Sequence, residues 1–282
     1  MKWMIWHHEL VLRSDVRVSP DDRGYVFGDG IYEVFRVYDG RIFEPEAHFE
    51  RLIRTAEGTK LTLPYDTASI QRRLEELLDR EGVRDGTIYL QITRGEAPRA
   101  HPFPAGAEPN LMAYCKELAR PSEAMSRGIS AVTLDDIRWL RCDLKTLNLL
   151  PNVLAKQEAV ERGADDAIWH RSGTVTECSA SNVMMVKDGI VRTHPANHLI
   201  LHGITRAVVL RLAKRLEVPV REEAFTLEEL ASADELFGTG TTIEVMPIVG
   251  VDGRPVGNGQ PGPVTRKLQQ AFEEEIAALR RR

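Results

Sequence analysis

Lys145 is the residue whose type and setting most directly indicate chemistry. It is the only lysine between Lys116 and Lys156, and it lies in the leucine-rich segment 138–150. Apolar surroundings disfavour the ammonium form of a lysine, and a neutral amine is the nucleophile that forms a Schiff base with a carbonyl compound. Taken alone, Lys145 is better explained as a surface lysine whose stem covers neighbouring leucines. A catalytic interpretation therefore depends on other residues.

Glu177 supplies an acidic group in the second half of the chain. It follows a predicted turn at Ser172–Gly173 and a short strand, and small residues follow it at positions 178–181. A carboxylate beside small residues can approach a bound ring closely. If that ring were the pyridine of pyridoxal phosphate, the acid would keep its nitrogen protonated and the ring electron-poor. Taken singly, Glu177 fits a solvated acid at a strand end.

Two glycine-containing segments are candidates to bind phosphate. Gly203 precedes Ile204 and Thr205, and the apolar periodicity that follows predicts a helix, whose first N–H groups favour an anion. Segment 238–242, Gly-Thr-Gly-Thr-Thr, contains Thr241 and combines backbone and hydroxyl donors. Either segment could instead be an ordinary helix cap or turn, since neither matches the nucleotide-binding P-loop pattern.

Together these motifs resemble the fold-type-IV pyridoxal-phosphate enzymes, which include branched-chain aminotransferases, D-amino acid aminotransferases and aminodeoxychorismate lyases. The resemblance extends from segment 22–30 to segment 265–268, and it includes Lys145 and the Thr176–Glu177 pair. Segment 94–101 places Arg99 and His101 two positions apart. This Arg-x-His pair resembles the D-amino acid aminotransferases within the family.

The resemblance implies a role for each matching residue. Lys145 would hold pyridoxal 5'-phosphate as a Schiff base, and Glu177 would face the ring nitrogen. Further contacts to the cofactor are implied for Arg51, Ser179, Leu201, Ile204, Thr205 and Thr241. Glu33 and His48 match a hydrogen-bonded relay behind the cofactor.

Three residues match a substrate-carboxylate site in the same family: Tyr32, Arg99 and His101. The planar guanidinium of Arg99 suits a carboxylate. His101 lies two residues further on, hence on the same side of an extended segment. From the residues alone, Arg99 and His101 fit a solvated loop equally well.

The implied reaction is ping-pong transamination of D-amino acids, with D-alanine and 2-oxoglutarate giving pyruvate and D-glutamate. The resemblance also implies a homodimer whose partner chain helps to build the site. A branched-chain aminotransferase, an aminodeoxychorismate lyase and a non-catalytic pyridoxal-phosphate-binding protein are the alternatives. Two residues depart from the D-amino acid pattern, because Ala180 and Gly240 occupy positions where serine is common. The missing hydroxyl at Ala180 is expected to affect the turnover rate more than the type of reaction.

The expected helices and strands predict a mixed α/β chain of two domains, residues 1–120 and 121–282. The larger C-terminal domain is expected to carry Lys145, and the cofactor is expected in the cleft between the domains. Helices are expected over 45–57, ending at Gly58, over 66–80, capped by Asp66 and Gly82, and over 152–162 and 263–279. Strands are expected over 87–93, 110–115 and 129–134, and segment 117–128 is expected to be a connector.

Composition narrows the class of protein. The chain has 282 residues, 43% hydrophobic residues and a formal net charge of −5, which does not favour a nucleic-acid-binding surface. No segment is long and apolar enough to predict a membrane span or a signal peptide. Three cysteines at unrelated spacings predict neither a disulfide framework nor a metal site. A cytoplasmic enzyme without a metal is the expectation.

Overall fold

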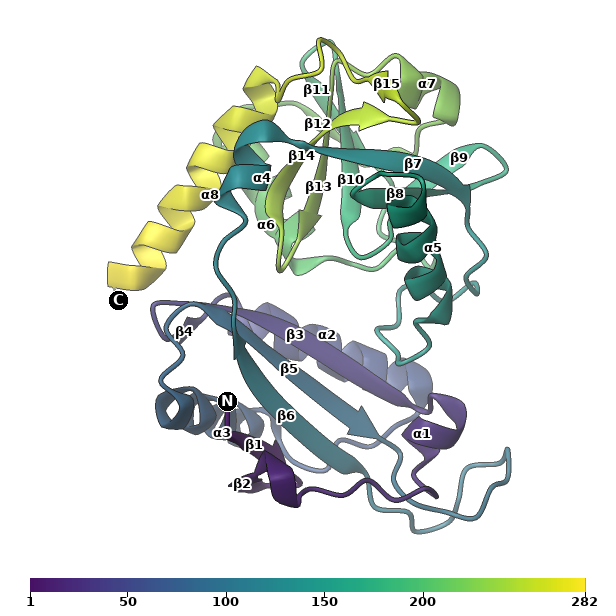
Figure 1. Cartoon of the computed structure of the whole chain (residues 1–282), viewed down its shortest axis with the longest axis vertical. Helices are drawn as coiled ribbons and strands as arrows, with labels where there is room; N and C mark the ends of the chain where they lie inside the picture. Colours follow the sequence, from purple (N-terminus) through teal and green to yellow (C-terminus); the bar gives the residue numbers. More distant parts are fainter. Residues whose placement is uncertain (282) are drawn as a thin grey trace. The chain divides into compact units, whose positions relative to one another are not determined.

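The structure is a computed structural model that describes residues 1–281, and its contacts divide the chain into two units (Figure 1). The first unit contains residues 1–119, 144–148 and the end of the chain from residue 279. The second contains residues 120–143 and 149–278. Lys145 is thus grouped with the N-terminal unit by its contacts, whereas the domain division predicted from the sequence, after residue 120, places it in the C-terminal domain. That division remains a prediction.

The first unit is built on a six-stranded sheet with the order β2-β1-β6-β5-β3-β4. Its elements are β1 (Trp3–Trp6), β2 (Glu9–Leu12), a 3-10 turn (Arg13–Asp15), α1 (Arg23–Phe27), β3 (Gly30–Tyr38), β4 (Arg41–Ile42), α2 (Pro45–Thr59), α3 (Thr67–Glu81), β5 (Gly86–Thr93) and β6 (Asn110–Glu117). Burial alternates along β5, as expected for a strand with one face in the core. Phe35, Leu90, Leu52 and Leu74 belong to one buried cluster, so α2 and α3 cover that face of the sheet (Figure 1).

The second unit contains a nine-stranded mixed sheet with the order β12-β11-β10-β13-β14-β7-β8-β9, in which β15 pairs with β14. Its strands are β7 (Ile129–Asp135), β8 (Asp166–Arg171), β9 (Thr174–Cys178), β10 (Asn182–Lys187), β11 (Ile190–Thr193), β12 (Val220–Arg221), β13 (Glu235–Gly240), β14 (Glu244–Val251) and β15 (Arg254–Pro255). Its helices are α4 (Ser122–Arg127), α5 (Leu150–Glu161), α6 (Ile204–Arg215), α7 (Leu227–Ala231) and α8 (Pro263–Arg281). Strand β10 is buried along almost its whole length, as expected for a central strand covered on both faces.

Most of the predicted elements are confirmed. Asp66 caps α3 through the backbone N–H of Ser69, and Gly82 ends this helix with a left-handed backbone conformation. The expected end of α2 at Gly58 is wrong, because the helix continues to Thr59 and ends at Lys60. Gly58 serves packing instead. A Cβ atom at this position would lie 2.4 Å from the Leu144 side chain. Segment 117–128 is also more than a connector, since it contains α4.

Among residues 1–281, no helix combines the length and apolar character needed to cross a bilayer. The same part of the chain holds no group of three or more histidine, cysteine or acidic side chains arranged to bind a metal ion. All three cysteines are buried free thiols.

Candidate active site

The Lys145 segment is anchored in the first unit by backbone contacts. The carbonyl of Lys145 accepts a hydrogen bond of 3.0 Å from the Tyr32 N–H, and the Lys145 N–H donates to Thr55 Oγ1 at 3.4 Å. The neighbouring Leu144 packs against Gly58, where any larger residue would displace it. The Lys145 side chain is half-buried, and its Nζ lies 4.2 Å from the centroid of the Tyr32 ring. The amine is therefore presented on an aromatic surface from a fixed backbone.

A buried cluster of Glu33, His48 and Arg51 lies on the core side of β3, the strand that carries Tyr32. Arg51 Nε donates to Glu33 Oε1 at 2.8 Å, and His48 Nδ1 lies 2.9 Å from Glu33 Oε2. Burial alone would raise the pKa of Glu33, but Arg51 and His48 outweigh it and hold that pKa well below its usual range. Burial lowers the pKa of His48, although Glu33 opposes this change. The cluster thus fixes a charged Arg51 against a charged Glu33 beside a histidine that burial keeps largely neutral.

Arg99 and His101 lie on an exposed loop after β5. Arg99 Cζ lies 5.1 Å from the centroid of the Phe27 ring, and the His101 ring lies 5.5 Å from the same ring. Arg23 holds the loop through a 2.6 Å hydrogen bond from Nη1 to the carbonyl of Ala100. Tyr32 instead stacks on another tyrosine of the sheet and contacts Lys145. The structure therefore brings Arg99 and His101 together, and it brings Tyr32 to Lys145.

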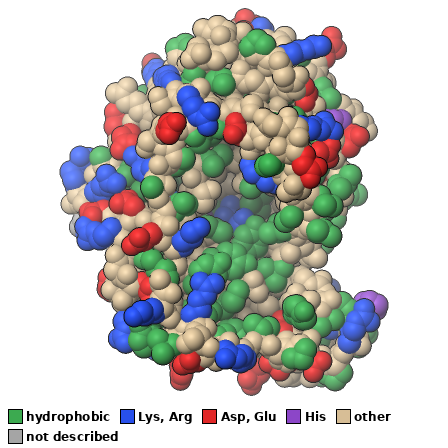
Figure 2. Space-filling model, in the orientation of Figure 1, with side chains coloured by type: hydrophobic (Ala, Val, Ile, Leu, Met, Phe, Trp, Pro, Cys, Tyr) green, Lys and Arg blue, Asp and Glu red, His purple; other side chains and the backbone are tan. Residues whose placement is uncertain are grey.

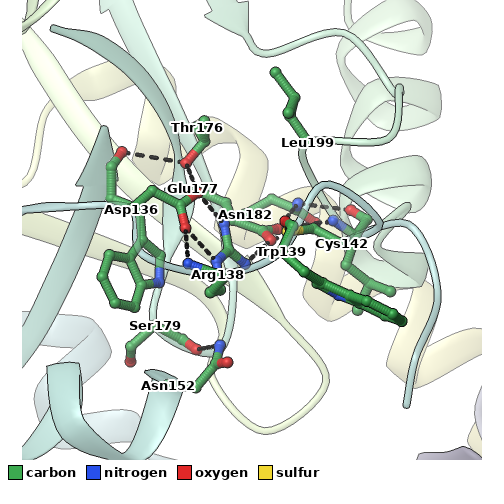
Figure 3. A network of polar contacts seen from close by, with 12 residues as sticks. Asp136, Arg138, Trp139, Cys142, Asn152, Thr176, Glu177, Ser179, Asn182 and Leu199 are labelled. Atoms are coloured by element: carbon green, nitrogen blue, oxygen red, sulfur yellow. Dashed lines mark hydrogen bonds and ion pairs between the residues drawn. The ribbon is translucent and has the colours of Figure 1, made fainter. Parts of the chain in front are cut away.

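In the second unit, Glu177 lies at the centre of a network of donors (Figure 3). Arg138 Nη1 donates to Glu177 Oε1 at 2.5 Å, and Asn182 Nδ2 donates to Oε2 at 2.9 Å. The backbone N–H of Leu201 donates to both oxygens, at 3.2 and 3.1 Å. Glu177 is only 4% exposed. The solvated strand-end interpretation is therefore wrong, because this carboxylate is buried and accepts hydrogen bonds from three other segments of the chain.

Arg138 and Asp136 are functional candidates that no sequence motif selects. Asp136 accepts hydrogen bonds from Arg138 and Arg171 and, as Figure 3 shows, from Thr176. Burial raises the pKa of Glu177 to about 7, and the Arg138 guanidinium opposes that rise. Arg138 and Asp136 stand two positions apart in a loop, and only the fold brings them to Glu177.

The α6 helix begins after Gly203, as its sequence predicts. Its N-cap is Gly203, so no side chain caps the first N–H groups of the helix, and Thr205 is buried in the first turn. Gly203 must be small here, because a Cβ atom would lie 2.0 Å from Asn182 Oδ1. On β13, Thr239 pairs with Asn182 across the sheet. Its hydroxyl is buried and bonds to no other described residue. This donor set fits a phosphate group.

The remaining predicted cofactor residues lie close to this region. The Ser179 hydroxyl donates to Asp166, and Asn152 holds the Ser179 carbonyl at 2.7 Å. Thr241 lies in the turn between β13 and β14. A Cβ atom on Gly240 would lie 3.2 Å from both Ile243 and Ser181, so a serine here would require a small adjustment of this turn. Ala180 is exposed at the bend beside it. Whether these residues contact a cofactor stays a prediction.

We expect Arg138→Met to move the acidic limb of the pH profile to higher pH. Burial raises the pKa of the Glu177 carboxyl, and without the guanidinium this rise is unopposed, so a higher pH is needed to ionise the group. The acidic limb of the pH–rate profile measures the change. Cofactor binding to the apoprotein should also weaken, by about tenfold or more, because a buried charge loses its partner.

The matched control is Arg138→Lys, which keeps the positive charge and should move the limb less than Arg138→Met does. An acidic limb that stays in place in Arg138→Met would show that Arg138 does not control the ionisation of Glu177.

The sequence and the fold match a known family. Residues 30–251 match the model of the amino-transferase class IV family, and the chain belongs to this family. The D-alanine aminotransferase of Staphylococcus epidermidis is 50% identical over 269 residues, which cover 95% of each chain. The D-alanine aminotransferase of Staphylococcus aureus (strain COL) is 47% identical over 277 residues, which cover 98% of each chain.

Among solved structures, the branched-chain amino acid aminotransferase from Escherichia coli is similar with a TM-score of 0.88 and 27% identity. The match covers 96% of this chain and 93% of that chain. The branched-chain amino acid aminotransferase from Thermobaculum terrenum, solved in its pyridoxal-phosphate form, also has a TM-score of 0.88, with 25% identity over 99% of this chain and 96% of that chain. The fold is therefore shared with branched-chain enzymes, whereas the sequence is much nearer to the D-alanine enzymes.

Proposed function

We propose that this chain is a pyridoxal-phosphate-dependent aminotransferase that moves the amino group of D-alanine to 2-oxoglutarate, giving pyruvate and D-glutamate. The observation that carries this proposal is the end-to-end similarity to D-alanine aminotransferases. The anchored Lys145 amine and the buried Glu177 supply the two groups that the chemistry needs.

The residues present fit the cofactor. Lys145 is the amine that holds it, Glu177 is the acid that faces its ring nitrogen, and Leu201 keeps that acid in place through its backbone N–H. Arg51, Ile204, Thr205 and Thr241 supply donors for the phosphate, with Ser179 shaping the nearby bend. When bound, pyridoxal phosphate supplies an aldehyde that reacts with amines and a ring that withdraws electrons.

Different residues of the protein then carry out different parts of the transamination. The Lys145 amine takes the proton from the α-carbon of the bound amino acid and returns it on the cofactor side. Glu177, as a carboxylate, keeps the ring nitrogen protonated. Tyr32, Arg99 and His101 bind the α-carboxylate of the substrate and so fix which hydrogen faces Lys145. Glu33 and His48 orient Arg51 from behind.

A direct test compares D-alanine with L-leucine and L-alanine as amino donors, using 2-oxoglutarate as acceptor. Turnover of D-alanine with little turnover of the L-amino acids supports the proposal. Equal or better rates with L-leucine would make the chain a branched-chain aminotransferase. With aminodeoxychorismate as substrate, pyruvate release through multiple turnovers without an added 2-oxo acid would make it a lyase.

Arg99→Ala is expected to raise the KM for D-alanine by about 10- to 100-fold, because a hydrogen bond between charged groups contributes about 1.5–3 kcal/mol. The kcat should change much less. Steady-state kinetics at several D-alanine concentrations measures this. Arg41→Ala, at an exposed arginine of β4, is the control. An unchanged KM in Arg99→Ala would remove this residue from the carboxylate site.

We also propose a homodimer as the working assembly, in the cytoplasm. Large apolar side chains are exposed on α5 and on the loop before it, and hydrophobic side chains gather over α5 in Figure 2. They are Ile137, Trp139, Leu140, Leu150, Val153, Leu154 and Val160. An exposed apolar surface of this kind favours association with another protein surface. The three free thiols are compatible with a reducing compartment.

A further inference from the structure

Arg36, on strand β3, is a buried cation whose hydrogen-bonding groups have no partner. The residue is 1% exposed, and its Nε, Nη1 and Nη2 bond to no other described residue. The Tyr38 ring centroid lies 5.1 Å from Arg36 Cζ, but a ring face does not pair the five N–H groups of a guanidinium. An arginine stays charged in proteins, and burying it unpaired is costly. A bound anion would supply the missing partner.

The face of the sheet that carries Arg36 is also the face that carries the Lys145 contact. Alternate residues of a strand share a face, so Tyr32, Val34 and Arg36 are on one face, and Glu33 and Phe35 are on the core face. The Lys145 amine contacts Tyr32. The strand length between Tyr32 and Arg36 is about 13 Å for four residues, and Val34 lies between them. In the structure the guanidinium lies over Tyr38, two residues further from Tyr32 on the same face, so it must turn back along the strand to meet a substrate held at Lys145.

The described sheet rows through Arg36 and toward Lys145 on this face contain no acid, and Asp85, just before β5, pairs with Arg280. The row across the sheet through Arg36 contains Thr87 and Lys116. The two rows toward Lys145 are formed by Val34, Tyr89 and Tyr114, and by Tyr32, Gln91 and Met112. The two acids nearest in sequence have other partners: Glu33 is held by Arg51 and His48 on the other face, and Asp39 pairs with Arg84. This face therefore offers an amine at one end, a mainly aromatic and aliphatic middle and the unpaired Arg36 guanidinium at the other end.

We propose that Arg36 binds the distal carboxylate of dicarboxylic substrates, namely 2-oxoglutarate and D-glutamate. This inference rests on the proposed function, because it takes the reacting carbon to be at Lys145. The aliphatic chain of the substrate lies over Val34 and Tyr89, and its second carboxylate reaches the guanidinium, whose planar arrangement of donors can bind both oxygens. Pyruvate and D-alanine end in a methyl group and do not need Arg36.

The test compares two amino acceptors in the holoenzyme. In Arg36→Gln, we expect kcat/KM for 2-oxoglutarate to fall by about 100-fold, because a bidentate charged contact is lost, whereas kcat/KM for pyruvate stays within about threefold. Arg36→Lys keeps the charge without the planar fork and should lose about tenfold with 2-oxoglutarate only. The control is Arg41→Gln, on the neighbouring strand β4, which should resemble the wild type with both acceptors.

A binding experiment gives a readout that does not depend on turnover. Glutarate, which has both carboxylates but no carbonyl to react, should bind to the wild-type holoenzyme by calorimetry and lose this binding in Arg36→Gln, whereas butyrate should bind both proteins equally. Equal losses with both acceptors, or unchanged binding of glutarate, would overturn the role of Arg36. A wild-type enzyme that does not transaminate D-alanine would overturn the proposed function instead, and glutarate binding would still test Arg36.

Discussion

Lys145→Ala should abolish transamination of D-alanine, with a fall in kcat of at least about 10³-fold. A positioned group that transfers a proton contributes about 10²–10⁴-fold, and the same amine holds the cofactor. The backbone of this segment is fixed by Tyr32 and Thr55, so removal of the side chain should leave the fold in place. Coupled measurement of pyruvate release gives the rate.

Two controls separate the amine from general effects of substitution. Lys156→Ala removes an exposed lysine of α5 and should keep full activity. Lys145→Arg keeps the positive charge but not the nucleophile, and it should be as inactive as Lys145→Ala. Borohydride reduction of the wild type followed by peptide mapping should find the reduced cofactor on Lys145. An adduct on another lysine, or none, would contradict the role of this residue.

Glu177→Gln should lower kcat/KM for D-alanine by about 10²- to 10³-fold. The change removes the charge but keeps the shape, so a protonated ring nitrogen would lose its acidic partner. The loss of one member of a buried charge pair costs about 3–5 kcal/mol, and each 1.36 kcal/mol corresponds to about tenfold in rate. Steady-state kinetics measures the fall, and the visible absorption spectrum of the bound cofactor should change with it.

The neutral amide would also leave Arg138 with one acidic partner fewer, although Asp136 still accepts from it. Cofactor binding must therefore be measured separately, and kcat/KM must be measured at saturating pyridoxal phosphate. Glu228→Gln, at an exposed acid of α7, is the matched control. A Glu177→Gln enzyme with wild-type kcat/KM would show that the ring nitrogen does not depend on this carboxylate.

The Arg36 and Arg99 predictions concern different carboxylates of one substrate. If both hold, Arg99→Ala weakens every amino donor and acceptor, because all of them carry an α-carboxylate. Arg36→Gln weakens only those with a second carboxylate. The contrast between pyruvate and 2-oxoglutarate therefore assigns each arginine to its own end of the substrate.

Much of the local structure is determined by the sequence alone, because it depends on neighbouring residues. Asp66 and Gly82 mark the ends of α3, and Thr226 with Glu229 forms the capping box of α7. The motif around Lys145 and the Gly203 helix start could likewise be identified, since backbone N–H groups at a helix start act as an anion site wherever the helix packs. The family followed from these motifs.

The tertiary structure decided which side chains meet. The expected stop at Gly58 failed because this glycine makes room for Leu144, a contact between residues 86 positions apart that no local rule contains. Arg138 reaches Glu177 across 39 positions. Arg36 has no motif at all, and it stands out only because burial leaves its charge without a partner. Burial and pairing are properties of the packed chain, since the free energy of a charged side chain depends on what surrounds it rather than on its sequence neighbours.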